Sequence, residues 1–279
     1  MRGTIKISTV AVSALALALS AGCGTAPNAP SAGGDTKPAD VLALLASDVT
    51  GSVHKVAEVT KNTRSMRLTM EARFDGVATK AEGVIAYGDP MKAELTMDMP
   101  DGKMTVRLIG AVEYIQIPAT DRGGLDGKKW MKLDLTELAK QAGGGDAIRQ
   151  FQDMDPGKQV RLLLAGGTLK AVGEEQVEGA RTMHYTGTAP IDTYLKQLDV
   201  KVQPEVKKQL GAMGAAEMTV DLWVDENYQP RRVRSVAGRT ESTVTYSDFG
   251  TPVSVTAPPA AETADFSDML KGLKLPTGK

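Results

Sequence analysis

Met66-Arg67-Leu68-Thr69-Met70-Glu71-Ala72-Arg73-Phe74 is the stretch that decides the fold. Its even-numbered residues are all apolar, and its odd-numbered residues are all polar. Because neighbouring side chains on a strand point to opposite faces, this period of two predicts a β-strand with one buried face and one solvated face. The same alternation recurs at residues 93–99 and 104–108, and shorter strands are expected at 112–117 and 129–133.

Short turns join these predicted strands and fix their direction. Gly88-Asp89-Pro90 and Pro100-Asp101-Gly102 leave too few residues for a parallel crossover, and Asp-Gly is a strong hairpin signal. A second set of strands is predicted at 169–177, 181–188, 217–224, 231–236 and 242–249. The sheet is therefore expected to be antiparallel.

Helical patterns frame the two sets of strands. Residues 40–61 carry apolar residues at steps of three and four, which predicts one long helix, and Pro38 just before it fits a helix entry. Further helices are predicted at 136–141, 146–152, 156–165 and 191–211, the last interrupted by Pro204. With one sheet face apolar, these helices should cover it. The predicted fold class is α+β, either a sheet-and-helix sandwich or an open barrel plugged by helices.

The N-terminus has the features of an export signal. Arg2 and Lys6 precede an apolar run at 10–19, which is too short to span a bilayer and is followed by Ser20-Ala21-Gly22-Cys23. This motif resembles the bacterial lipobox, with Ser20 where Leu is commonest. The resemblance implies cleavage after residue 22 and attachment of acyl chains to Cys23. Cys23 is the only cysteine, so no internal disulfide can form.

Composition divides the rest of the chain. Residues 1–22 are read as a lipoprotein signal peptide, 23–39 as a Gly/Pro-rich flexible tether, 40–257 as one domain, and 258–279 as a C-terminal tail. Loss of Arg2 and Lys6 with the signal changes the formal net charge from −1 to −3. This mild acidity argues against a nucleic-acid partner.

No catalytic or metal-binding motif is present. The chain has two histidines, His54 and His184, whereas histidine-based metal sites mostly use two or three together. The sequence has no G-x-S-x-G elbow, phosphate-binding loop or H-E-x-x-H pattern. We therefore expect a protein that is not an enzyme and that uses no cofactor and no metal.

Methionine is unusually frequent on the predicted apolar face. Because its side chain is unbranched and polarisable, a surface rich in methionine adapts to flexible ligands such as acyl chains. The candidate lining residues are Met66, Leu68, Met70, Leu95, Met97, Met99, Met104, Val106 and Leu108. Trp130 and Trp223 are weaker candidates. The competing interpretation is that these side chains only fill the space between sheet and helices.

Three further motifs indicate a family. Together with the lipobox, the tether and the opening helix, residues 129–134 (KWMKLD), 177–185 (VEGARTMHY) and 221–226 (DLWVDE) resemble the actinobacterial envelope lipoproteins of the LppX–LprG group. That group shares the half-barrel fold of the lipoprotein carrier LolA, in which a curved antiparallel sheet wraps around helices. The resemblance covers roughly residues 40–257.

The resemblance implies a function and a location. It implies non-covalent binding of lipid or glycolipid acyl chains in an apolar cavity, with possible transfer across the cell envelope. The chain is expected at the extracytoplasmic face of the cell membrane, anchored through lipidated Cys23. The alternative is a structural or regulatory envelope lipoprotein on the same fold, with a filled interior, no lipid ligand and a protein partner of unknown identity.

Overall fold

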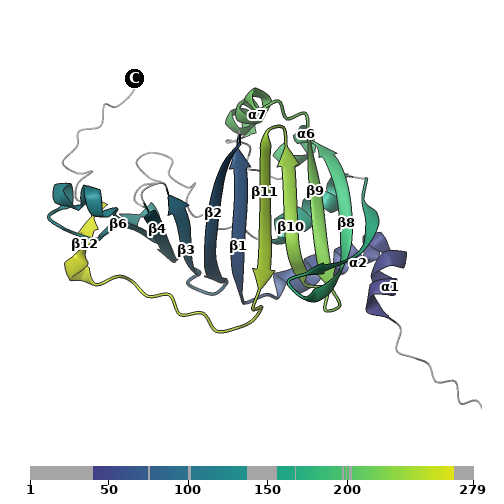
Figure 1. Cartoon of the computed structure of the whole chain (residues 1–279), viewed down its shortest axis with the longest axis horizontal. Coiled ribbons are helices and arrows are strands. Elements are labelled where there is room, and N and C mark those ends of the chain that lie inside the picture. The colour runs from purple at the N-terminus through teal and green to yellow at the C-terminus, as the bar shows by residue number, and fades with distance from the viewer. Residues whose placement is uncertain are drawn as a thin grey trace, which may run out of the picture. The chain divides into compact units, whose positions relative to one another are not determined.

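A single antiparallel-rich sheet organises the domain (Figure 1). The computed structural model describes residues 40–74, 76–99, 102–136, 156–166, 168–196, 198, 200 and 203–266. Within these residues the sheet has twelve strands in the order β12-β6-β5-β4-β3-β2-β1-β11-β10-β9-β8-β7. Every neighbouring pair is antiparallel except β12 and β6.

Two meanders make up the sheet, and β1 and β11 join them at its centre. The first comprises β1 (Ser65–Phe74), β2 (Val77–Ala86), β3 (Lys92–Met99), β4 (Gly102–Ile109), β5 (Val112–Gln116) and β6 (Trp130–Asp134). The second comprises β7 (Lys170–Val177), β8 (Ala180–Pro190), β9 (Glu217–Asp225), β10 (Pro230–Ala237) and β11 (Thr240–Ser247). This arrangement confirms the predicted curved antiparallel sheet.

Helices cover one face of the second meander. They are α1 (Val41–Ser47), α2 (Val49–Lys61), α5 (Pro156–Gly166), α6 (Ile191–Leu195) and α7 (Gln203–Ala212). In Figure 1, α2 and α6 lie behind the long strands β8–β11. Leu45 of α1, Val53 of α2 and Val160 of α5 are fully buried in the same apolar cluster as Leu222 of β9. We call the face towards the helices the inner face and the opposite one the outer face.

The opening helix is broken, although the sequence predicted one helix over residues 40–61. Asp48 ends α1, and its side chain accepts a hydrogen bond from the backbone N–H of Gly51, which caps α2. A short acidic side chain at this position competes with the continuing helix for backbone donors. The predicted helix over 191–211 likewise becomes two, α6 and α7. The helices predicted at 136–141 and 146–152 fall almost wholly outside the described residues.

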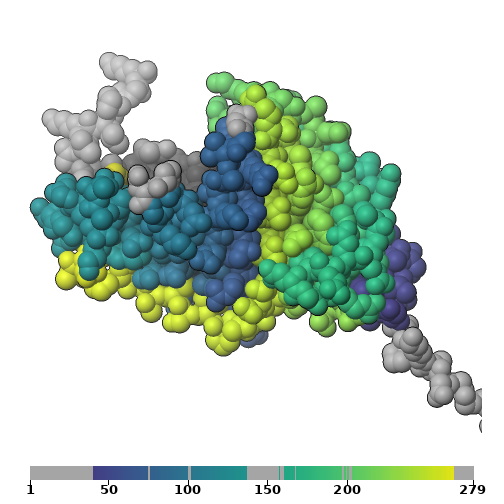
Figure 2. Space-filling model, in the orientation of Figure 1, coloured from purple at the N-terminus to yellow at the C-terminus, as the bar shows by residue number. Residues whose placement is uncertain are grey.

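The sheet extends past residue 257, where we predicted the domain to end. After β11 the chain runs along the margin of the first meander and forms a short 3₁₀ helix, η2 (Ala260–Glu262), and then β12 (Thr263–Asp265) beside β6 (Figures 1 and 2). Val255 is buried, and Lys132 of β6 forms an ion pair with Asp265 at 2.9 Å. Residues 258–266 of the predicted tail therefore belong to the domain.

Candidate functional site

The inner face of the first meander is built from aligned rows of apolar side chains. The pairing of β1 to β4 places Met66, Ile85, Ala93 and Leu108 in one row. The next row contains Leu68, Gly83, Leu95 and Val106, and the one after it Met70, Ala81, Met97 and Met104. Because directly opposed side chains share a face, each row is a continuous apolar band across four strands.

Exposure rises along the strands, from one row to the next. On β1, Met66 and Leu68 are buried, Met70 is half-buried and Phe74 is 50% exposed. On β2, Ile85 is buried whereas Val77, which opposes Phe74, is 69% exposed. On β1 the same apolar face therefore passes from a closed interior to an open edge.

The nine candidate lining residues all lie on this face, at different depths. The buried ones are Met66, Leu68, Leu95, Val106 and Leu108. Met70, Met97 and Met104 are half-buried, and Met97 and Met104 pack against the core. Met99 lies at the end of β3 and is 45% exposed. That these side chains line a lipid cavity stays a prediction.

Sequence reasoning missed the strand that completes these rows. β2 contributes Ile85, Ala81 and Gly83 between the lining residues of β1 and β3. A Cβ atom at Gly83 would overlap the backbone carbonyl of Glu94 and lie 2.6 Å from Leu95 Cδ2, so glycine is required where Leu95 leans across β2. The short apolar run Val84-Ile85-Ala86 was the available signal.

One carboxyl group lies among these apolar side chains. Glu113 of β5 opposes Leu108 of β4 on one side and Leu133 of β6 on the other, which places it on the inner face. Burial raises the pKa of this carboxyl above its ordinary value of 4.5. Glu113 therefore adds an ionisable group to the edge of an otherwise apolar band.

A hydrogen bond from β8 holds helix α1 against the inner face of the second meander. Tyr185 of β8 is fully buried, and its hydroxyl donates a hydrogen bond of 2.9 Å to the backbone carbonyl of Leu45 at the end of α1. Burial raises the pKa of Tyr185 to about 12. This bond fixes α1 against the sheet, so the interior is closed at this side.

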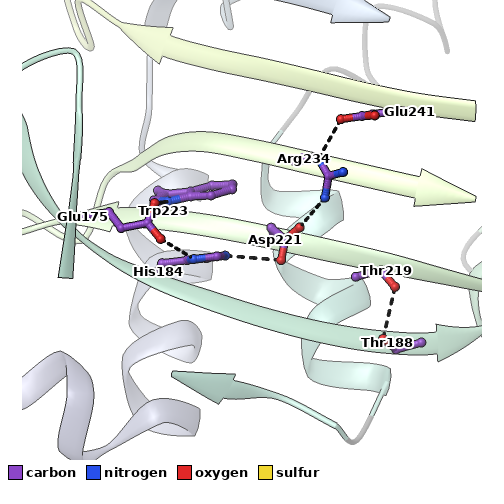
Figure 3. A network of polar contacts seen from close by, with 8 residues as sticks. All are labelled: Glu175, His184, Thr188, Thr219, Asp221, Trp223, Arg234 and Glu241. Atoms are coloured by element: carbon purple, nitrogen blue, oxygen red, sulfur yellow. Dashed lines mark hydrogen bonds and ion pairs between the residues drawn. The ribbon is translucent and has the colours of Figure 1, made fainter. Parts of the chain in front are cut away.

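The outer face of the second meander carries a polar network (Figure 3). His184 of β8 stacks on Trp223 of β9 with ring centroids 4.2 Å apart. Its Nδ1 is 2.9 Å from Glu175 Oε1 and its Nε2 is 3.3 Å from Asp221 Oδ1. The indole N–H of Trp223 donates to Glu175 at 2.7 Å, and this bond is the main reason why the pKa of Glu175 lies below its ordinary value.

This network holds strands together and leaves no ring nitrogen of His184 free. Asp221 also accepts from Arg234 of β10 at 3.1 Å, and Arg234 donates to Glu241 of β11 at 2.7 Å. The chain of contacts thus crosses β7 to β11 and ties five strands on the outer face. His54, by contrast, is exposed on α2.

Both tryptophans lie on the outer face, which corrects their assignment as weaker lining candidates. Trp223 alternates with the inward Leu222 and Val224. Trp130 of β6 lies beneath the guanidinium of Arg107, 4.8 Å from the ring centroid, and Arg107 pairs with Glu94 at 2.5 Å. Their burial comes from stacking and from cationic neighbours, not from the interior.

A groove of about 570 Å³ lies on the outer face, lined by residues of β1 to β4, β10 and β11. Hydroxyl and charged side chains line it, among them Thr69, Glu71, Lys80, Arg232 and Thr243. Lys80 is paired with Glu71 at 2.6 Å. The groove is thus polar and largely charge-compensated.

The described residues contain no group of three His, Cys, Asp or Glu side chains placed to hold a metal ion. Among the described helices, none combines the length and apolarity needed to cross a membrane.

Comparison with known proteins identifies the family. The model of the LppX_LprAFG lipoprotein family matches residues 48–255. An uncharacterized 31.2 kDa protein of Streptomyces griseus is 31% identical over 217 residues, which cover 70% of this chain and 71% of that protein. The crystal structure of lipoprotein LppX from Mycobacterium tuberculosis superposes with a TM-score of 0.51 at 18% identity, covering 75% of this chain and 99% of LppX. LprF from Mycobacterium bovis gives 0.50 at 11% identity, covering 76% and 97%. The two structures share the fold, and the sequence matches show that this chain belongs to the LppX_LprAFG lipoprotein family.

Proposed function

We propose that the protein binds the acyl chains of a lipid or glycolipid on its inner face and carries them within the cell envelope. The observation that carries this proposal is the set of aligned apolar rows on β1 to β4. Along β1 and β2 this face passes from fully buried Met66 and Leu68 to exposed Phe74 and Val77. A filled protein core has no need to continue its apolar surface into solvent at a strand end.

The chemistry of the rows suits an acyl chain. Each buried methylene group contributes about 0.8 kcal/mol, so a long chain is held without a charged anchor. The half-buried row contains Met70, Met97 and Met104, whose flexible thioethers adapt to a chain of no fixed shape. No reacting group is required, so the proposed activity is binding and transfer without catalysis.

Anchoring belongs to the same proposal. Acylation of Cys23 would hold the protein on the extracytoplasmic face of the cell membrane, and residues 24–39 would serve as its tether. More than one acyl chain on Cys23 would make this attachment stable, since a single chain gives only marginal binding.

Native mass spectrometry tests the binding proposal. The domain starting at Asp40, where the described fold begins, is expected to carry an extra mass equal to a lipid that disappears under denaturing conditions. Leu95→Trp should fill the inner face and remove this mass while the protein stays folded. Leu44→Trp, at a 50% exposed position on α1, is the matched control and should keep the lipid. A mass equal to the bare chain after incubation with membrane extract would refute lipid binding.

A structural or regulatory lipoprotein is the alternative, and the polar groove on the outer face favours it. The groove offers hydroxyls and paired charges to a polar partner. In that case Leu95→Trp should overpack a filled core and cost about 1–3 kcal/mol of stability, with no lipid to lose.

A further inference from the structure

Three exposed apolar side chains gather where the inner face opens. Phe74 and Val77 oppose each other at the β1–β2 hairpin, and Met99 ends β3 beside the β3–β4 hairpin. They are 50%, 69% and 45% exposed. We call these three residues the lip. All three lie on the inner face, so the lip continues the apolar rows and is not a separate patch.

The register of the second meander places the lip far from the start of the domain. Phe74 opposes Thr240 of β11, and the pairing continues through Ala237 and Met218 to Ala189 at the end of β8. Asp40 is held at the other end of β8, where Arg181 binds it at 3.2 Å. Ala189 lies eight residue steps along the extended strand from Arg181, which is about 26 Å.

Two lysines near the lip are paired with carboxylates. Lys80 pairs with Glu71 at 2.6 Å, and Lys103 lies 3.5 Å from Glu82 and 3.8 Å from Asp98. These cations point to the outer face, so the lip itself presents only apolar atoms. A surface of this kind fits the acyl region of a bilayer better than an anionic headgroup layer or an acidic protein.

We propose that the lip docks on a lipid bilayer and that acyl chains enter the inner face there. An extracted chain would then move from bilayer to lip to buried rows without crossing water. The sixteen residues between Cys23 and Asp40 could span at most about 55 Å, which exceeds the length of the domain from Asp40 to the lip. The anchored protein can therefore lay its lip on the membrane that anchors it. Docking uses the proposed anchor but does not depend on the proposed binding of lipid, whereas acyl entry rests on that binding.

The first test measures docking with the full, anchored chain in phosphatidylcholine vesicles. Val77→Cys provides a thiol for an environment-sensitive fluorophore at the lip, and Val172→Cys is the matched control on β7, where valine is 56% exposed. Because a docked apolar group lies about 5–10 Å into the bilayer, spin-labelled phospholipid should quench the lip fluorophore and spare the control. Quenching should survive high salt and be independent of anionic lipid. Equal quenching at both positions, or none at the lip, would overturn the docking proposal.

The second test measures entry. Phe74→Ser/Val77→Ser/Met99→Ser should slow uptake of a fluorescent phospholipid from vesicles about tenfold, equivalent to about 1.4 kcal/mol. Leu44→Ser/Val172→Ser removes equally exposed apolar residues elsewhere and should leave uptake unchanged. Unchanged uptake in the triple variant would refute entry at the lip. A quenched lip in a protein that never carries lipid would refute the proposed function alone, and a lipid-loaded protein with an unquenched lip would refute docking alone.

Discussion

Three methionines on one apolar face allow a graded test of how the inner face is packed. Met66 is fully buried, Met70 lies two pairs further along β1 and is half-buried, and Met99 is 45% exposed. Met66→Ala should cost about 2–5 kcal/mol of unfolding free energy, because truncating a buried methionine loses the free energy of burying its side chain and also leaves a cavity. Met99→Ala should cost no more than about 0.5 kcal/mol. Met70→Ala should lie between them, near 1 kcal/mol.

Urea unfolding of delipidated protein measures the unfolding free energy of each variant. The variants can be compared because each carries the same Met→Ala change on a strand of one sheet, so differences in strand propensity largely cancel. Lipid binding should rank the variants in another order. Met70→Ala should weaken retention of lipid more than Met99→Ala does, because Met70 lies within the adaptable row. If Met70→Ala costs as much stability as Met66→Ala, the half-buried row is an ordinary packed core, and the argument from graded exposure fails.

Three other contacts lead to testable predictions. Gly83→Ala should destabilise the protein by about 1–3 kcal/mol in thermal or urea unfolding, because its Cβ would meet the backbone of β3, and an unchanged midpoint would contradict the close approach. Tyr185→Phe should cost about 1 kcal/mol by removing the bond to Leu45. Because the pKa of Tyr185 is raised to about 12, the native protein should also lose stability between pH 10 and pH 12, and the variant should lose less. The fluorescence of Trp223 should change as pH falls below the ordinary Glu175 pKa of 4.5, because protonation breaks their bond, and Glu175→Gln should abolish that change.

The sequence predicted strand faces well because alternation is a local property. Residues 66–74 alternate without exception, and the structure buries their even positions as far as the helices and neighbouring strands reach. The hairpin at Glu178-Gly179 was predictable for a similar reason. Both residues adopt positive φ values of 49° and 82°, which glycine tolerates at no cost and which suit a tight turn.

The alternating pattern did not predict a strand where the inward residues are small or polar. In β2 the inward positions hold Val77, Thr79, Ala81, Gly83 and Ile85, a set too small and too polar to stand out from a loop. At Gly83 there is no room for a side chain because Leu95 of the neighbouring strand leans across β2. The strand therefore becomes recognisable only after the neighbouring strands are placed. Because the sequence did not predict β2, it did not predict the aligned rows of the candidate site.

An even or odd position along a strand gives the face of a side chain only when the orientation of one residue on that strand is known. The two tryptophans illustrate this. On β6 the inward residues are Met131 and Leu133, so Trp130 points outward despite being the largest apolar side chain on the strand. How far an inward residue is buried is a further property that the local sequence pattern does not predict. Phe74 and Met66 occupy equivalent positions in the same alternation, yet one is half-exposed and the other fully buried, because only the closed end of the sheet is covered. The difference in depth is what turns an amphipathic sheet into a surface with an open end, and the proposed lip follows from that difference.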